Sequence, residues 1–281
     1  MRHTYLALGA LLAAVATPAF AHGAAGGCTA PIPLDLSGPR PMVTLTNGAG
    51  VETKALFDTG AMGTVVASDQ AERLGLTNEG PLGAPFAGHG TGYKSSVHGM
   101  RVGGLRLPDG PVAVLPAMIP GIGAVLSPQS FVGRLVRLDL AAGTLALCPA
   151  SLAHSLGKAT PYIPGPFALP GIPLSIGGQA VAALIDTGSP LDLAFPMRFA
   201  KTLPLDGPLV AAGKARSHDG EHPVFKARIK GALKVGPVTL SNPEVRFSDV
   251  VPEPNVGGAL LRRMVITIDA AGKRSWVQAG R

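Results

Sequence analysis

The chain has 281 residues, of which 46% are hydrophobic, 15% charged and 5% aromatic. This apolar fraction is too high for a disordered chain, and the glycines follow no collagen period. The formal net charge of +7 is moderate. A nucleic-acid partner would require the basic residues to cluster in one patch, so we expect none. The 38 glycines and 27 prolines favour a β-rich fold with many turns over a helical bundle.

The first 21 residues have the features of a secretory signal peptide. A basic start is followed by an apolar run over 5–15 and by the cleavage pattern Ala-Phe-Ala at 19–21. The apolar run is shorter than the ~20 residues that cross a bilayer, which disfavours a transmembrane anchor. We therefore predict cleavage near Ala21 and export to the periplasm or the medium, with no transmembrane segment in the mature chain. A lipoprotein attached through Cys28 is the weaker alternative, because the aliphatic residue expected three positions earlier is missing.

Cys28 and Cys148 are the two cysteines of the chain. In an exported protein a disulfide between them is the default expectation, and two buried free thiols are the alternative. The histidines and cysteines show no metal-ligand spacing, and no phosphate-binding or dinucleotide-binding glycine motif follows a strand into a helix. We therefore expect neither a metal nor another cofactor.

An internal duplication runs through most of the chain. The sequence ALFDTGA at 55–61 recurs as ALIDTGS at 183–189, and a strand with a hairpin signal precedes each copy. Later in each half, a Gly-containing apolar element at 121–126 corresponds to 256–261 in the order of the repeat. Several blocks in the same order make a chance similarity an inadequate explanation.

The duplication predicts the domain organisation. After the signal peptide we expect an N-terminal lobe over 31–150, a Gly- and Pro-rich linker over 151–166 and a C-terminal lobe over 167–281. Short strands and frequent turns dominate both halves, with short helices expected over 65–74, 127–135 and 259–264. Each lobe is thus predicted to be mainly β.

The duplicated D-T-G is the motif that indicates chemistry. One copy is weak evidence, since these residues are common at turns, but two copies at equivalent places after apolar strands are specific. If Asp58 and Asp186 meet face to face, their carboxyls cannot both ionise cheaply, and the pair shares a proton. The ionised partner can then deprotonate a water, while the protonated partner donates to a carbonyl oxygen.

The residues beside the two aspartates have expected roles of their own. The hydroxyls of Thr59 and Thr187 can each bond to the opposite loop. Gly60 and Gly188 have no Cβ, so backbone N–H groups can approach the carboxylates closely. Ser189 can add a hydroxyl donor that the first copy lacks, which would make the two carboxyls electrostatically unequal.

These motifs resemble the aspartic peptidases of the pepsin and retropepsin group. Pepsins carry two D-T-G lobes in one chain, retropepsins carry one lobe and dimerise, and this chain is similar to two retropepsin-sized units in tandem. The resemblance implies two β-barrel lobes related by a pseudo-two-fold axis, and Asp58 and Asp186 as a catalytic pair that hydrolyses peptide bonds. It also implies a peptide or protein substrate, a monomeric pseudo-dimer, and Ile122-Gly123 and Val256-Gly257 behind the active loops.

A hairpin flap over the cleft is a further implication of the resemblance. GHGTGY at 88–93 lies where the first-half flap belongs and is similar to the Tyr-Gly-Thr-Gly of pepsin flaps. His89 occupies the Tyr place, Gly90 follows it, and Tyr93 comes after the turn. His89 or Tyr93 would cover the substrate; the alternative is a Gly-rich loop with two exposed side chains.

Some features leave other interpretations open. Pro190 departs from the family pattern and favours an extended backbone at Ser189. A non-catalytic module of the same fold could receive a peptide as an added strand, although both aspartates are intact. A structural envelope protein with two D-T-G turns would leave the duplication unexplained. Basic residues at 226, 228 and 230 alternate with apolar ones, which indicates a solvated strand face or a preference for acidic substrates.

Overall fold

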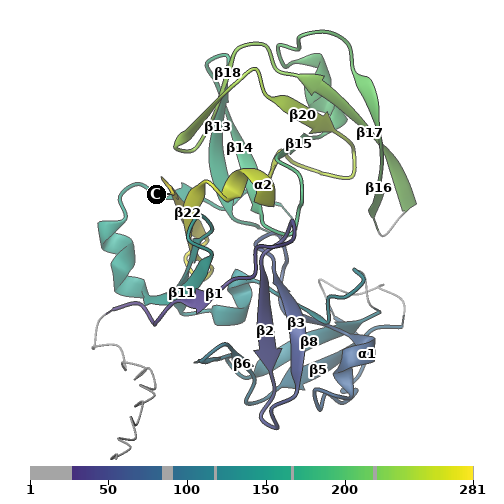
Figure 1. Cartoon of the computed structure of the whole chain (residues 1–281), viewed down its shortest axis with the longest axis vertical. Coiled ribbons are helices and arrows are strands. Elements are labelled where there is room, and N and C mark those ends of the chain that lie inside the picture. Colours follow the sequence, from purple (N-terminus) through teal and green to yellow (C-terminus); the bar gives the residue numbers. More distant parts are fainter. Residues whose placement is uncertain (1–26, 84–90, 117–118, 166–167, 218–219, 281) are drawn as a thin grey trace, which may run out of the picture.

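The computed structural model describes residues 27–83, 91–116, 119–165, 168–217 and 220–280 (Figure 1). The expected signal peptide and the flap residues His89 and Gly90 lie outside the described residues. The described chain forms three β-sheets, one in each half and one that the two halves share. None of its helices is long and apolar enough to span a bilayer.

The first-half sheet has eight strands in the order β5-β8-β4-β9-β3-β2-β6-β7. They are β2 Met42–Thr46, β3 Glu52–Phe57, β4 Val65–Ala67, β5 Tyr93–Val97, β6 Arg101–Val102, β7 Leu105–Arg106, β8 Gly110–Leu115 and β9 Ala124–Leu126. Strand β2 buries alternate residues, as a strand with one solvated face does. Strand β3 lies between β2 and β9, and its last three residues are all buried. The helix expected over 65–74 is only α1, Ser68–Ala71, because the three residues before it form the buried strand β4.

The second-half sheet repeats this order and adds one strand, giving β16-β17-β20-β15-β21-β14-β13-β18-β19. Its strands are β13 Gly171–Ile176, β14 Gln179–Asp186, β15 Leu193–Phe195, β16 Val210–Ser217, β17 Gly220–Arg228, β18 Ala232–Val235, β19 Val238–Ser241, β20 Glu244–Phe247 and β21 Asn255–Gly257. The added strand is β16, at one edge. The remaining eight strands, read from β17 at one end to β19 at the other, correspond one by one to the eight strands of the first sheet, read from β5 to β7. The prediction of two mainly β, tandem lobes related by pseudo-two-fold symmetry is therefore confirmed, and Figure 1 shows them one above the other.

A third sheet joins the two halves, with the order β1-β11-β10-β22-β23-β12. Its strands are β1 Ile32–Pro33, β10 Arg134–Asp139, β11 Thr144–Pro149, β12 Thr160–Pro161, β22 Met264–Asp269 and β23 Arg274–Ala279. Strands β10 and β22 pair antiparallel at its centre, with Arg137 opposite Thr267. The segment 151–166, expected as a linker, contains β12 and most of the 3-10 helix η2, Ala150–Ser155. The end of each half is thus built into a sheet with the other half.

The structure corrects one part of the repeat alignment. In the first lobe Phe57 of β3 pairs with Leu126 of β9, and in the second Ile185 of β14 pairs with Val256 of β21. The counterpart of Leu126 is therefore Val256, so the alignment of 121–126 with 256–261 is wrong by five residues. That alignment was based on matching glycines in the two segments, whereas the pairing with the Asp-bearing strands sets the true register.

The expected position of Ile122-Gly123 is wrong for the same reason. The N–H of Gly123 donates to the carbonyl of Lys54 at 2.9 Å, near the start of β3 and away from Asp58. Ser127, at the start of the 3-10 helix η1 (Pro128–Phe131), takes the place behind the first loop. Gly257 takes it in the second lobe, where α2 (Gly258–Leu261) begins.

The predicted disulfide between Cys28 and Cys148 is present, with an S–S distance of 2.02 Å. It packs in a small apolar cluster with Leu135 of β10 and Trp276 of β23. The bond thus ties the start of the described chain to the sheet that the two halves share.

We expect the double substitution Cys28→Ser with Cys148→Ser to lower the free energy of unfolding by about 2–4 kcal/mol, since the bond closes a long loop of the unfolded chain. Urea unfolding of the oxidised wild type and of the variant measures this difference. Equal midpoints would show that the bond contributes nothing to stability. The same titration of the wild type in a reducing buffer should match the variant.

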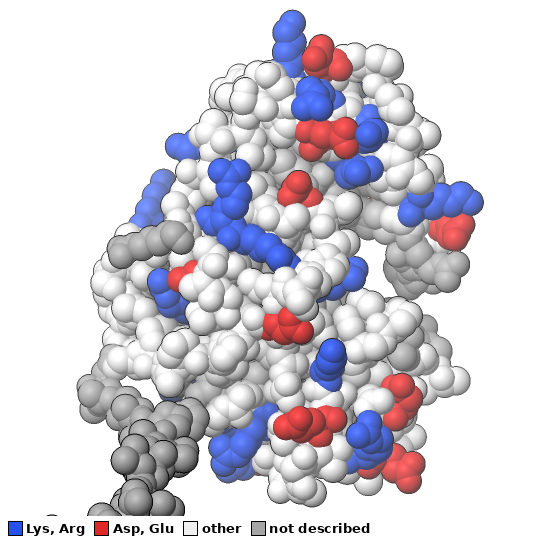
Figure 2. All heavy atoms as spheres, in the orientation of Figure 1, with Lys and Arg blue, Asp and Glu red and all other residues white. Residues whose placement is uncertain are grey.

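The basic residues of β17 have partners on the neighbouring strand or loop. The Lys226 ammonium lies 3.2 Å from a carboxylate oxygen of Glu244, and the Arg228 guanidinium donates to the carbonyl of Asn242 at 2.8 Å. On the face shown in Figure 2, Lys and Arg side chains likewise alternate with Asp and Glu. A solvated strand face accounts for this basic alternation.

Candidate active site

The two D-T-G loops begin where central, buried strands end. The Asp58 N–H donates to the carbonyl of Leu126 at 2.8 Å, and Asp186 pairs with Gly257 at the end of β14. Each aspartate is therefore held by its own lobe through the parallel neighbour of its strand. Both side chains are half-buried.

Two threonines hold the loops against each other. The Thr59 hydroxyl donates to the carbonyl of Ile185 at 2.7 Å, and the Thr187 hydroxyl donates to the carbonyl of Phe57 at 2.6 Å. Each hydroxyl also accepts the backbone N–H of the other threonine at 3.0 Å. Both threonines are fully buried. This symmetric set of four hydrogen bonds fixes the distance between the loops and brings Asp58 and Asp186 together.

The glycines of the loops lie directly against the carboxyl groups. A Cβ built on Gly60 would lie 3.0 Å from Oδ1 of Asp186 and 3.3 Å from Oδ1 of Asp58. The two carboxyl groups therefore lie close to the same side of Gly60 and close to each other. A Cβ on Gly188 would overlap the carboxyl of Asp58. No other residue type fits at 188 without displacing that carboxyl.

The surroundings of Asp58 favour its protonated form. The pKa of Asp58 is raised to about 7, chiefly by burial and then by the negative charge of Asp186 and a hydrogen bond with that carboxyl, while the backbone N–H groups of Gly60 and Gly188 oppose the shift. The Gly60 N–H donates to Oδ1 of Asp58 at 2.8 Å. The pair therefore retains one proton up to near-neutral pH.

Asp186 accepts a different set of hydrogen bonds. The backbone N–H of Ser189 donates to its Oδ1 at 2.9 Å, and the side-chain amide of Asn255 donates to its Oδ2 at 2.6 Å. The Ser189 hydroxyl, expected as the donor, instead accepts the N–H of Leu191 at 3.4 Å. Sequence reasoning missed Asn255, although a lone Asn before Val256-Gly257 in an apolar element was a usable signal.

Comparison with known proteins bears on the whole arrangement. A family described as aspartyl protease matches residues 43–129 and 172–266, with one D-T-G in each segment. The chain belongs to the aspartyl protease family. No curated protein matches the chain.

In this aspartyl protease family member, an arginine connects the first lobe to the second D-T-G loop. Arg40, just before β2, donates from Nε to the carbonyl of Gly188 at 2.6 Å. On the other side of the loop, the N–H of Gly258 at the start of α2 donates to the carbonyl of Ser189 at 2.8 Å. The second loop is therefore held from both lobes, a contact between distant segments that the sequence did not indicate.

Tyr93 is the one flap candidate within the described residues. It is half-buried at the start of β5 and pairs with Val114 of β8. It also forms a β-bridge with Pro81, on the other side of the segment 84–90. Figure 2 shows the surface indented between the two lobes, on the right of the view.

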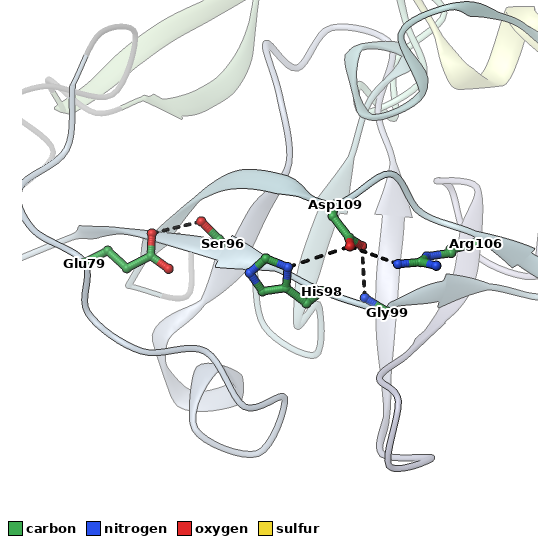
Figure 3. Close-up of polar contacts among 6 residues, drawn as sticks. All are labelled: Glu79, Ser96, His98, Gly99, Arg106 and Asp109. Atoms are coloured by element: carbon green, nitrogen blue, oxygen red, sulfur yellow. Dashed lines mark hydrogen bonds and ion pairs between the residues drawn. The ribbon is translucent and has the colours of Figure 1, made fainter.

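An exposed polar cluster on the first lobe of this protease family member contains a His, an Asp and a Ser (Figure 3). Asp109 lies 3.7 Å from Nδ1 of His98 and 2.9 Å from the guanidinium of Arg106. The N–H of Gly99 holds the pKa of Asp109 below its usual value, and Arg106 adds to this effect. The nearby Ser96 hydroxyl donates to Glu79 at 2.9 Å and points away from His98, so the three residue types form no nucleophilic triad.

Proposed function

We propose that this chain is an exported aspartic endopeptidase that hydrolyses peptide bonds with a water activated by Asp58 and Asp186. The observation that carries the proposal is the contact of the two carboxyls across the lobes, with the pKa of Asp58 raised to about 7. Such a pair holds one acid and one base in a single site at the same pH. Membership of the aspartyl protease family supports a peptide or protein substrate.

Each carboxyl has one task in the proposed reaction. A water between them loses a proton to ionised Asp186 while its oxygen attacks the peptide carbon, and protonated Asp58 gives its proton to the carbonyl oxygen. The tetrahedral intermediate then breaks its C–N bond. The leaving nitrogen takes the proton from Asp186, and a hydroxyl of the intermediate returns one to Asp58. One water is consumed, and the dyad regains its starting protonation.

The threonine contacts support this use of the site. Catalysis by two carboxyls requires them to stay at a constant separation while charge moves between them. The four hydrogen bonds of Thr59 and Thr187 hold each loop against the end of the opposite buried strand and against the other loop. Binding of a substrate would therefore not have to assemble the pair.

Digestion of a peptide library by the purified mature protein tests the proposal. We expect cleavage that a statine-type peptide, a mimic of the tetrahedral intermediate, blocks at a one-to-one ratio. Peptide binding without any turnover would instead identify a non-catalytic module of this fold, and complete loss of cleavage with a chelator alone would contradict the water-activating pair.

The export part of the proposal rests on the disulfide, because such bonds persist in oxidising compartments. The N-terminal pattern supports cleavage near Ala21. Mass spectrometry of the protein recovered from the periplasm or the medium should find a mature chain that starts at residue 22. Recovery of the uncleaved chain from the cytoplasm would contradict export.

The raised pKa of Asp58 predicts the pH dependence of both activity and stability. Activity should be lost as the pH rises through about 7, because Asp58 then loses the proton that it donates. The folded state also binds this proton more tightly than the unfolded state, where the pKa is near 3.8. The resulting stabilisation is fully present below about pH 4 and is lost as the pH rises through about 7.

Rate profiles and urea titrations between pH 4 and 9 measure the two effects. We expect the loss of the Asp58 proton to lower the free energy of unfolding by about 1–3 kcal/mol over this range. The partial exposure of Asp58 and its coupling to Asp186 keep this decrease below the value that the full pKa shift would give. The Asp58→Asn variant should lack this part of the decrease. A rate that stays constant from pH 6 to 9 would contradict the assignment of the acid.

A further inference from the structure

The two lobes repeat the same strands, but they surround their aspartates differently. Since Leu126 is the counterpart of Val256, the residues one position earlier, Val125 and Asn255, are also counterparts. The first lobe thus has an apolar side chain where the second has an amide. The sequence predicted an inequality from the Ser189 hydroxyl, but that hydroxyl accepts the N–H of Leu191, and the donor to Asp186 is the side-chain amide of Asn255.

Asn255 contacts Asp186 directly. Its Nδ2 donates to Oδ2 of Asp186 at 2.6 Å, and the residue is only 5% exposed. An amide nitrogen can only donate, so this bond favours the ionised carboxylate over the neutral acid. Shielding from water strengthens the effect, because a hydrogen bond to a charged group is stronger where the local dielectric is low.

Asn255 is also a costly residue to bury. Its Oδ1 is buried and has no hydrogen-bond partner among the described residues. An unpaired buried acceptor destabilises the folded state, whereas the first lobe fills the equivalent position with valine. Stability alone therefore does not account for the asparagine, and its contact with Asp186 is the interaction that distinguishes it from valine.

We propose that Asn255 is a positioning residue that assigns the negative charge of the dyad to Asp186 and its proton to Asp58. This inference rests on the proposed function for its catalytic meaning. It makes Asp186 the base that takes the proton of the water and Asp58 the acid in the first step. The two lobes of the fold would then have fixed and different roles, although their loops are nearly identical in sequence.

The charged groups on the elements around Asp186 are consistent with this assignment. Asp58 faces it from the first loop, and burial of Asp58 together with the repulsion between the two carboxylates favours ionisation of only one of them. Arg40 binds the carbonyl of Gly188, one residue beyond Thr187, and so adds positive charge on the side of the second loop. Arg262, which follows α2, donates to the carbonyl of Gly38. Asp192, which lies in the second loop beyond Ser189, is exposed.

The substitution Asn255→Val, which installs the residue of the first lobe, tests the proposal through the pH profile. The acidic limb of kcat/KM reports ionisation of the base in the free enzyme. In Asn255→Val we expect the pKa of this limb to rise by ~1 pH unit, which lowers kcat/KM tenfold at pH values below the limb. The melting temperature should stay equal or increase. The mirror change Val125→Asn adds a donor on the Asp58 side and should not raise the limb. An unchanged limb in Asn255→Val overturns the proposal.

A titration that needs no turnover keeps this test separate from the proposed function. Carbon-13 NMR of labelled aspartate carboxyls in the wild type, assigned with Asp58→Asn and Asp186→Asn, follows each proton directly. Ionisation of Asp186 at a lower pH than Asp58 supports the proposal, and the reverse order overturns it even where Asn255→Val does not fold. If no peptide is cleaved at any pH, the proposed function fails, while this titration still decides which of the two carboxyls holds the proton, and its repetition in Asn255→Val decides whether Asn255 sets that order.

Discussion

Replacement of either Asp58 or Asp186 by asparagine is expected to lower kcat/KM for peptide cleavage by at least about 10³-fold, the scale of a lost general acid or base. An amide has nearly the shape of the carboxyl, and its oxygen can still accept the N–H of Gly60 or Ser189. It can neither accept the proton of the water nor donate an acidic proton. The loss should therefore be chemical rather than structural. Kinetics on the best peptide from the library, with thermal melting of each variant, measure both quantities.

The matched control for these variants is Asp69→Asn. Asp69 is an exposed carboxylate on α1, in the same lobe as Asp58. This change should leave both the cleavage rate and the melting temperature equal to those of the wild type. Full cleavage by either dyad variant would refute the paired-carboxyl mechanism, and equal losses in Asp69→Asn would show that the assay responds to general surface charge.

The substitution Gly188→Ala is expected to reduce kcat/KM by at least about 10²-fold, because positioning errors near 1 Å cost that much. The added methyl group would occupy the place of the Asp58 carboxyl, to which Gly188 is packed from the other lobe. Asp58 would have to turn away from Asp186, which separates the acid from the base. Binding of the statine-type inhibitor should weaken in parallel, since it depends on the same pair.

Two other alanine substitutions extend this prediction to a graded series of effects. At Gly60 the built Cβ lies 3.0 Å from Asp186, so Gly60→Ala should have a smaller effect than Gly188→Ala. At Gly63, beyond the end of the first D-T-G motif, a Cβ meets nothing within 4 Å, and Gly63→Ala should be close to wild type. A Gly188→Ala enzyme as active as Gly63→Ala would mean that the carboxyls do not meet as the structure has them.

The family, the two-lobed fold and the disulfide could all be predicted from local patterns. The repeated D-T-G after apolar strands needs only neighbouring residues, and two cysteines allow one pairing. The later apolar elements were misaligned because two short Gly-rich segments can be aligned in several registers that match similar residues. Only the pairing of β9 with β3 and of β21 with β14 selects one of them.

The amino-acid sequence alone thus establishes that two equivalent turns each present an aspartate, because turn chemistry and strand burial are encoded within a few residues. The tertiary structure decides what surrounds each aspartate. Arg40 reaches a loop 148 residues away, and Asn255 lies 69 residues from Asp186. Such contacts depend on how separate strands pack, and the residues that distinguish two carboxyls in nearly identical loops are therefore identified only once the lobes are folded together.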